Sequence, residues 1–214
     1  AAIVVVAVLG LIKPREFLRL WRISRIEAGI AGSTFVITLL AAPQLYWGVL
    51  AGVLMALSHF LYQRLHPRII EVGRHPDGSL RDRHLWTLPP LASRCYALRM
   101  DAALDFASAA EFERAIVERL AQAPDTRHVC LFAQPINRID ATGADIFLKL
   151  SAQLQAHGIT LHISGMKLPV EKALHKAGWR SQGSHLRLYR TELDAVQALA
   201  RLEPEADDIA AAAI

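Results

Sequence analysis

AGIAGSTFVITLLAAPQLYWGVLAGVLMALSHFLYQ, residues 28–63, is a run without a single Lys, Arg, Asp or Glu. A transmembrane helix needs about 20 apolar residues to cross a hydrocarbon core of ~30 Å. As one helix this run would reach roughly 54 Å at 1.5 Å per residue, and Pro43 offers a break near its middle. The run therefore predicts a membrane hairpin of two rather short helices, about 27–42 and 44–63, joined by a tight turn.

Basic residues flank this run on both sides. Five lie between Lys13 and Arg25 before it, and Arg64, Arg68 and Arg74 follow it. Cytoplasmic loops carry an excess of Lys and Arg, so both flanks are expected in the cytoplasm. Two crossings satisfy that condition and one crossing does not, which supports the hairpin. Gly48 and Gly52 match the small-residue spacing of closely packed membrane helices.

The charge balance divides the chain in the same way. Residues 1–70 hold seven basic and two acidic residues, whereas the remainder holds 17 basic and 18 acidic ones. A nucleic-acid-binding domain would need a basic globular face, and the globular half is nearly neutral. The composition, 53% hydrophobic, also excludes a disordered chain, and the uncharged runs exclude one soluble core for the whole sequence.

Two segments precede the hairpin. Residues 1–12, AAIVVVAVLGLI, are apolar and lack the basic region of a signal peptide, so we expect the end of a helix and, with it, the C-terminal piece of a longer protein. Residues 14–26 are predicted to form an interfacial helix. Its apolar face holds Phe17, Leu20, Trp21 and Ser24, and its basic face holds Arg15, Arg19 and Arg22. The alternative is a cytoplasmic helix packed on protein.

The globular half alternates strand and helix patterns. Residues 71–90 are rich in Gly, Pro and charge and predict a linker and first strand. Ser108 and Glu111 match a capping box that opens a helix. Further strands are expected near 95–101, 127–133, 159–163 and 185–190, with helices over 142–156, from Pro169 to Gly178, and after a Thr191 cap. The order predicts an α/β domain, a small mixed sheet with helices packed on it, and residues 203–214 are expected to fray.

No enzyme signature emerges. The seven histidines of the globular half show no metal-ligand spacing such as H-E-x-x-H, and no Ser lies in a G-x-S-x-G elbow. Cys95 and Cys130 are expected to be free thiols in a reduced compartment. There is no P-loop motif. The Ser164-Gly165-Met166 turn could face a phosphate, but a plain strand-to-helix turn explains it better.

Three segments together carry a family resemblance. They are the apolar stretch from Leu9 to Ile69, LRMDAALDFASAAEFE from Leu98, and INRIDATGADIFLKL from Ile136. The chain resembles the C-terminal end of SulP (sulfate permease) anion transporters, which end in a membrane hairpin and a cytoplasmic STAS domain. The implied domains are a C-terminal transmembrane segment at 1–70, a linker and first strand at 71–90, a STAS domain at 91–202 and a flexible tail at 203–214.

The resemblance implies secondary active transport of sulfate or another small anion in a multi-pass protein of the cell membrane. In the family the anion lies between two half-helices of a core domain upstream, so the resemblance places no substrate-binding residue in this chain. It implies gate-domain helices, a homodimer, a regulatory protein at the STAS domain, and no catalytic residue, metal or cofactor. A membrane-tethered STAS regulator of the anti-sigma-factor-antagonist type is the alternative function.

The segment Asp140-Ala141-Thr142-Gly143 is the candidate regulatory site. In STAS domains that resemble anti-sigma-factor antagonists, the Ser or Thr before this Gly is phosphorylated, and Thr142 occupies that position. Asp140 matches the acidic residue two places earlier. A phosphate at a helix N-terminus would interact with its free N–H groups. The alternative is that Thr142 is only the N-cap of the helix, supported by Asp145.

Overall fold

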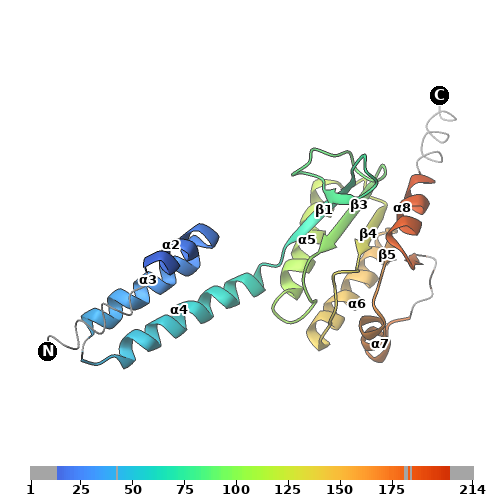
Figure 1. Ribbon diagram of the computed structural model, residues 1–214. Coiled ribbons are helices and arrows are strands. Elements are labelled where there is room, and N and C mark those ends of the chain that lie inside the picture. The colour runs from blue at the N-terminus through green and yellow to red at the C-terminus, as the bar shows by residue number, and fades with distance from the viewer. Residues whose placement is uncertain (1–13, 42, 181–182, 184, 203–214) are drawn as a thin grey trace. The chain divides into compact units, whose positions relative to one another are not determined.

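The computed structural model describes residues 14–41, 43–180, 183 and 185–202. The chain divides into two compact units, residues 1–63 and residues 64–214, which are described separately (Figure 1). The first is helical and the second is an α/β sheet domain, so the predicted fold class is confirmed. The expected helix end at 1–12 and the tail at 203–214 lie outside the described residues.

The helical unit begins with α2 (Pro14–Ile23), which is shorter than the predicted interfacial helix over 14–26. It ends there because Ser24 takes an extended conformation and caps α3 (Arg25–Leu40), its hydroxyl accepting a hydrogen bond from the Glu27 N–H at 3.3 Å. A turn containing Pro43 leads to α4 (Tyr46–Leu65). The two helices of the hairpin are thus present, within about two residues of the predicted bounds.

Helices α3 and α4 approach closely at two glycines, as the Gly48/Gly52 spacing predicts. A Cβ on Gly48 would collide with the backbone and side chain of Thr38, and one on Gly52 would lie 2.7 Å from a methyl carbon of Thr34. Both threonine hydroxyls donate to carbonyls one turn back in α3, each at 2.7 Å. The helix contact therefore consists of small residues and already satisfied hydroxyls.

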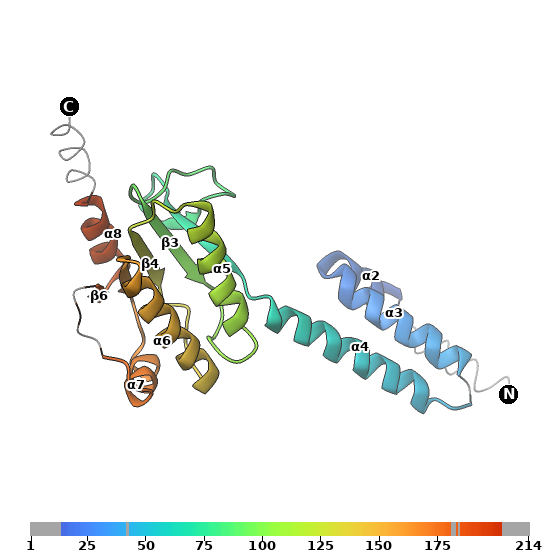
Figure 2. The same ribbon diagram turned by 180° about the vertical axis from the view of Figure 1, so that it is seen from behind.

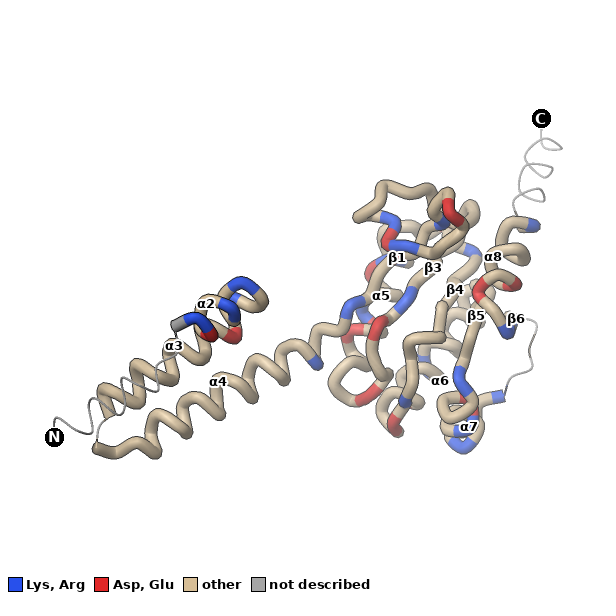
Figure 3. Tube along the Cα trace, viewed as in Figure 1, with Lys and Arg blue, Asp and Glu red and all other residues tan. Residues whose placement is uncertain are grey.

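Helix α4 is long and apolar enough to cross a bilayer, and within the described helices it alone meets that length, because α3 has 16 residues. Most of its large apolar side chains are exposed, among them Val49, Leu54 and Leu57 at 61%, 53% and 57%. Figure 3 shows no charged residue along most of the two helices. Such a continuous apolar surface needs lipid or further protein to cover it.

The second unit contains a six-stranded sheet in the order β2-β1-β3-β4-β5-β6. The strands are β1 (Ile69–Arg74), β2 (Leu80–Asp82), β3 (Cys95–Met100), β4 (His128–Phe132), β5 (Thr160–Ser164) and β6 (Leu186–Tyr189). Strands β3 to β6 are parallel, and β1 pairs antiparallel with both β2 and β3. The central strands are short and almost wholly buried, as strands covered on both faces are.

Helices cover both faces of this sheet. On one face α5 (Ala109–Gln122), α6 (Ala141–Ala156) and α7 (Leu168–Lys176) enclose the larger core around Leu98, Phe112 and Leu131. Figure 2 views the sheet from the side of α5 and α6. On the other face α8 (Glu192–Ala200) packs Val196 and Leu199 against Cys130 and Phe132. The carboxyl ends of the parallel strands thus lead into the loops that begin α5, α6, α7 and α8.

Two local expectations differ from the structure. The capping box at Ser108 is wrong: Ser108 precedes α5, but its hydroxyl donates to the Ala103 carbonyl at 2.7 Å and accepts from the Asp105 N–H at 3.0 Å instead of capping the helix. Residues 71–90 hold more sheet than a linker and one strand. Strand β1 already begins at Ile69, and β2 pairs with it across a turn in which Gly78 has φ +84°.

Candidate functional site

The predicted segment 140–143 lies where β4 leads into α6, beside the loop that joins β3 to α5. These two loops are bonded through their backbones. The Leu104 N–H donates to the Arg138 carbonyl at 3.0 Å, and the Asp140 N–H donates to the Leu104 carbonyl at 3.3 Å. Leu104 and Ile139 form a parallel bridge. The candidate site is therefore a two-loop structure at the carboxyl edge of the sheet, and sequence analysis predicted only one of the two loops.

Asp140 joins the two loops through its side chain. It is the N-cap of α6, and its Oδ1 accepts from the Gly143 N–H at 2.8 Å. Its Oδ2 accepts from the Phe106 N–H at 2.9 Å, 34 residues away in sequence. One carboxylate therefore satisfies a free donor of the helix and a donor of the neighbouring loop, and such hydrogen bonds to a charged acceptor are the stronger kind.

Gly143 is required by the close approach of these loops. A Cβ at this position would collide with the Leu104 carbonyl oxygen, which is the acceptor of the Asp140 N–H. That oxygen belongs to the backbone and cannot rotate away. The glycine therefore permits contact between the first turn of α6 and the 104–106 segment, and the reason for its presence is packing rather than a left-handed conformation.

Thr142 is not the N-cap of α6 that the capping alternative predicted. The N-cap is Asp140 and the helix starts at Ala141, so Thr142 is the second helical residue and is exposed. The proposal that Thr142 itself caps the helix is wrong, because Asp140 already holds the Gly143 N–H. Phe106 lies in the bonded neighbouring loop and is 70% exposed. An exposed hydroxyl and an exposed aromatic ring thus share this edge of the domain.

A buried carboxylate supports the site from beneath. Asp105 is 4% exposed, and its Oδ2 accepts from the Arg138 guanidinium at 3.1 Å while Oδ1 accepts from the Ala107 N–H at 3.2 Å. A buried charge needs such partners to be tolerated. Sequence reasoning did not identify Asp105, Phe106 or Arg138, because their pairing crosses more than 30 residues and no local motif encodes it.

The histidines are less scattered than the sequence indicates. The His128 Nδ1 and His162 Nε2 atoms lie 3.2 Å apart, and the His162 Nδ1 lies 2.9 Å from the Tyr189 hydroxyl. These three residues stand on neighbouring parallel strands. Burial, together with the nearby His128 and Arg187, lowers the pKa of His162 to about 4, and burial also lowers the pKa of His128. The chain of rings is therefore neutral near pH 7.

The remaining candidate groups offer little chemistry. Cys95 and Cys130 are free and buried, and burial raises the pKa of both thiols. The Ser164 side chain is fully buried without a hydrogen-bond partner, which does not suit a phosphate-facing turn. Within the described residues no three His, Cys, Asp or Glu side chains are placed to hold a metal ion.

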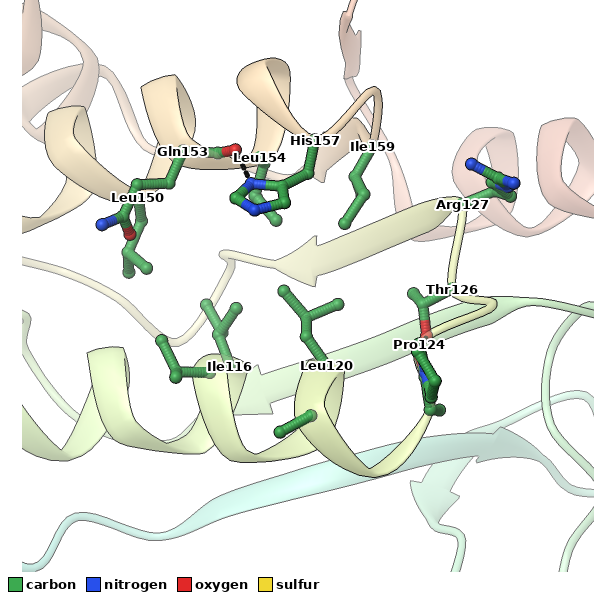
Figure 4. A pocket seen from close by; sticks show the side chains of 13 residues that line it. Ile116, Leu120, Pro124, Thr126, Arg127, Leu150, Gln153, Leu154, His157 and Ile159 are labelled. Atoms are coloured by element: carbon green, nitrogen blue, oxygen red, sulfur yellow. Dashed lines mark hydrogen bonds between the residues drawn. The ribbon is translucent and has the colours of Figure 1, made fainter.

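A cleft of about 450 Å³ separates the carboxyl-terminal halves of α5 and α6. Figure 4 shows Ile116 and Leu120 of α5 facing Leu150 and Leu154 of α6 across it. His157 lies at the rim, its Nδ1 bonded to the Gln153 carbonyl at 2.8 Å. The facing helix walls are apolar, and Thr126, Arg127, Gln153 and His157 make up the polar part of the lining. The cleft has the size of a small-ligand pocket.

Comparison with known proteins agrees with this arrangement of segments. The STAS domain family matches residues 90–195, from the segment before β3 into α8. A relative from Mycobacterium tuberculosis named "Probable sulfate transporter Rv1739c" is 30% identical over 204 residues, 94% of this chain and 36% of its own length. "Probable sulfate transporter 4.2" of Arabidopsis thaliana is 28% identical over 83% of this chain and 28% of its own length.

This chain belongs to the SulP family. The relatives align with the helical unit as well as with the STAS domain, so the membership does not rest on the domain alone. The murine Solute Carrier 26 family member A9 anion transporter, in its inward-facing state, shares the fold, with a TM-score of 0.69 and 18% identity over 89% of this chain and 31% of that one. The SulP chain spans about a third of the length of the curated relatives it matches.

Proposed function

We propose that this SulP chain forms the last membrane helices and the cytoplasmic STAS domain of a multi-pass secondary anion transporter, with sulfate as the first candidate substrate. The supporting observation is the order of parts: a helical pair without charge over residues 28–63 is followed by a STAS domain, and both align with a sulfate transporter over 94% of the chain. Basic residues on both sides of the pair favour a cytoplasmic position for the STAS domain.

In this proposal the transporter binds its anion in a part of the protein other than the C-terminal third to which this chain aligns. In this proposal α3 and α4 belong to the gate, against which a mobile core moves during alternating access. Close packing at Gly48 and Gly52 suits a rigid element of that kind, because it brings the two helix backbones together without movable side chains between them. We also propose that the STAS domain contributes to a homodimer and binds a regulatory protein.

The uptake of labelled anions tests the proposed function directly. The complete open reading frame would be reconstituted in vesicles and given labelled sulfate, with bicarbonate and succinate as competitors. We expect saturable sulfate uptake that an unlabelled competitor of the true substrate class reduces. Absence of uptake for all three anions, in vesicles with verified insertion of the protein, would contradict the proposal.

The 140–143 segment supports a regulatory role at the STAS domain. A phosphate on Thr142 would place about two negative charges near the Asp140 carboxylate, whose oxygens hold the Gly143 and Phe106 N–H groups. Repulsion between the phosphate and the Asp140 carboxylate would weaken the hydrogen bond from the Phe106 N–H. That bond joins the Asp140 side chain to the neighbouring loop. Phosphorylation would therefore loosen the 104–106 segment and change the surface around the exposed Phe106.

Mass spectrometry of the protein from its own cells tests this regulation. We expect phosphorylated Thr142 in at least one growth condition, and a T142V variant that loses the modification. Peptides that cover Thr142 in all conditions without phosphate would contradict it. The transport proposal would stand in that case, because uptake is measured separately.

A membrane-tethered STAS regulator remains the second candidate function, favoured by the exposed Thr142 and Phe106 on one edge. In that case the chain would act by binding a protein partner and would move no anion. Affinity capture with the intact membrane protein would recover a kinase or an anti-sigma-like partner whose binding T142D abolishes. The uptake experiment separates the two candidates, because only the transporter accumulates labelled sulfate.

A further inference from the structure

Helix α2 carries two chemically distinct faces. Arg15, Arg19 and Arg22 recur at spacings of four and three residues and form a stripe along one side. Phe17 and Trp21 lie on the opposite side of the helix, since successive residues turn by about 100°, and Leu18 lies at the edge of this apolar arc, between Trp21 and Arg22. With only ten residues, α2 therefore separates three positive charges from a compact apolar arc.

The arginine stripe has no anionic partner within the part of the chain that the structure describes. All three side chains are exposed, and none of them forms an ion pair, although Glu16 lies on the same helix. Arg22 in the last turn also suits the helix dipole. Arg15 and Arg19 have no such explanation, because Arg15 lies in the first turn, where positive charge is unfavourable, and Arg19 lies in the middle of the helix, where the dipole has little effect.

The apolar arc is only partly covered by protein. Phe17 packs on α3, its ring 3.6 Å from where a Cβ of Gly32 would stand, and Trp21 lies 6.4 Å from Phe17 between ring centroids. Even so, Phe17, Leu18 and Trp21 remain 42%, 60% and 49% exposed.

We propose that the Arg15–Arg19–Arg22 stripe of α2 binds the phosphates of anionic phospholipids while the apolar arc enters the acyl-chain boundary. A guanidinium group bonds a phosphate through two parallel N–H groups, and three of them at helical spacing can hold neighbouring head groups. The aromatic residues suit the interface, where part of a ring meets hydrocarbon and part meets water. This inference rests on the proposed membrane placement of the helical pair but not on transport activity.

The lipids that remain bound to the protein test the proposal. The full chain would be extracted in polymer-bounded discs from vesicles of equal phosphatidylcholine and phosphatidylglycerol, and the ratio of the two retained lipids would be measured. We expect phosphatidylglycerol enrichment that falls about tenfold in R15Q/R19Q/R22Q. The matched control R180Q/R187Q/R201Q removes the same charge from exposed STAS positions and should keep the enrichment. Equal enrichment in the parent and the stripe variant would overturn the proposal.

Trp21 provides a second reading that does not depend on head-group chemistry. Brominated acyl chains quench tryptophan fluorescence at short range, so the parent protein should lose a component that W21F lacks. A Trp21 signal that brominated lipid leaves unchanged, together with an unaltered lipid ratio in the stripe variant, would mean that α2 is covered by protein. Failure of anion uptake leaves both readings intact, so the two proposals can fail independently.

Discussion

The two units of this chain bury their apolar residues in opposite ways. In the STAS domain, large apolar side chains such as Leu98 and Phe112 are almost fully buried between sheet and helices. In α3 and α4, side chains of the same chemical types point outward, and the contacts between helices rely on Gly48, Gly52 and two threonines. The STAS domain has its own core, whereas the helical unit needs lipid or further protein to cover its apolar surface. The same substitution should therefore have different effects in the two units.

The largest difference is expected for leucine truncation. Leu98→Ala creates a cavity in a fully buried site and should lower the free energy of unfolding of the STAS domain by about 2–5 kcal/mol. Leu57→Ala in α4 removes a 57% exposed side chain and should leave that value nearly unchanged. Urea unfolding of both variants in detergent, followed by STAS-domain circular dichroism, compares them. Equal losses would refute the contrast between the units.

Replacing a glycine by alanine in each unit compares the effect of one added Cβ atom in the STAS domain and in α3. Gly143→Ala brings a Cβ against the Leu104 carbonyl oxygen and should cost about 2–4 kcal/mol. Gly29→Ala places a methyl group on a helix with nothing within 4 Å, and higher helix propensity should make it neutral or slightly stabilising. Thermal unfolding of the two variants is the measurement. A Gly143→Ala protein as stable as the parent would mean that the two loops are not in contact.

Acid should weaken the STAS domain through His162. Its pKa is lowered from 6.5 to about 4 in the folded state, so the unfolded chain binds a proton that the folded domain excludes. Stability is thus complete above about pH 6.5, falls by up to about 3 kcal/mol as the pH drops toward 4, and then levels off. Urea midpoints between pH 4 and pH 7 measure this slope. His162→Gln should flatten it, and an unchanged slope would exclude His162 as its origin.

Removal of the carboxylate at the two-loop contact has a smaller expected effect. Asp140→Ala loses the helix cap and the bond to Phe106 and should cost about 1–2 kcal/mol. Thr191→Ala is the matched control, because Thr191 caps α8 in a complete capping box without a distant partner, and its cost should be about 1 kcal/mol. Hydrogen exchange at Phe106 should rise in the Asp140 variant alone. Protection of Phe106 in both variants would show that the side-chain bond is dispensable.

Thr142→Val is expected to have the smallest effect, below about 0.5 kcal/mol, because the side chain is exposed and forms no hydrogen bond within the described structure. A stable T142V protein would separate a regulatory role of the hydroxyl from a structural one. Thermal unfolding checks the expectation. A loss above 1 kcal/mol would assign Thr142 to the architecture of the helix start.

The sequence was informative where neighbours in the chain decide the outcome. The period of apolar residues and the Thr191 cap followed from local pattern, and the structure has the full Thr191–Asp194 box. Ser108 carries the same kind of motif, yet its hydroxyl bonds the preceding loop because that loop folds back on it. Asp140 could have been recognised as the cap, since an Asp three residues before a close-packed Gly suits that role.

Long-range pairing was beyond the reach of the sequence. The bonds from Asp140 to Phe106 and from Arg138 to Asp105 join residues more than 30 positions apart, and the His128–His162 contact depends on strand register. Strand β2 was missed because three residues carry too little pattern to separate an edge strand from a loop. Local sequence therefore located the candidate segment, while its structural partners came from the parallel order of β3 and β4.

The backbone pairing of Leu104 with the 138–140 segment has a kinetic consequence. The amide protons of Leu104 and Asp140 lie inside the same small ladder, so neither can exchange with water until both loops separate. Opening at this edge is then a cooperative, all-or-none event instead of gradual fraying. Any signal that reaches the first turn of α6 would be registered as a change in the fraction of molecules that are open.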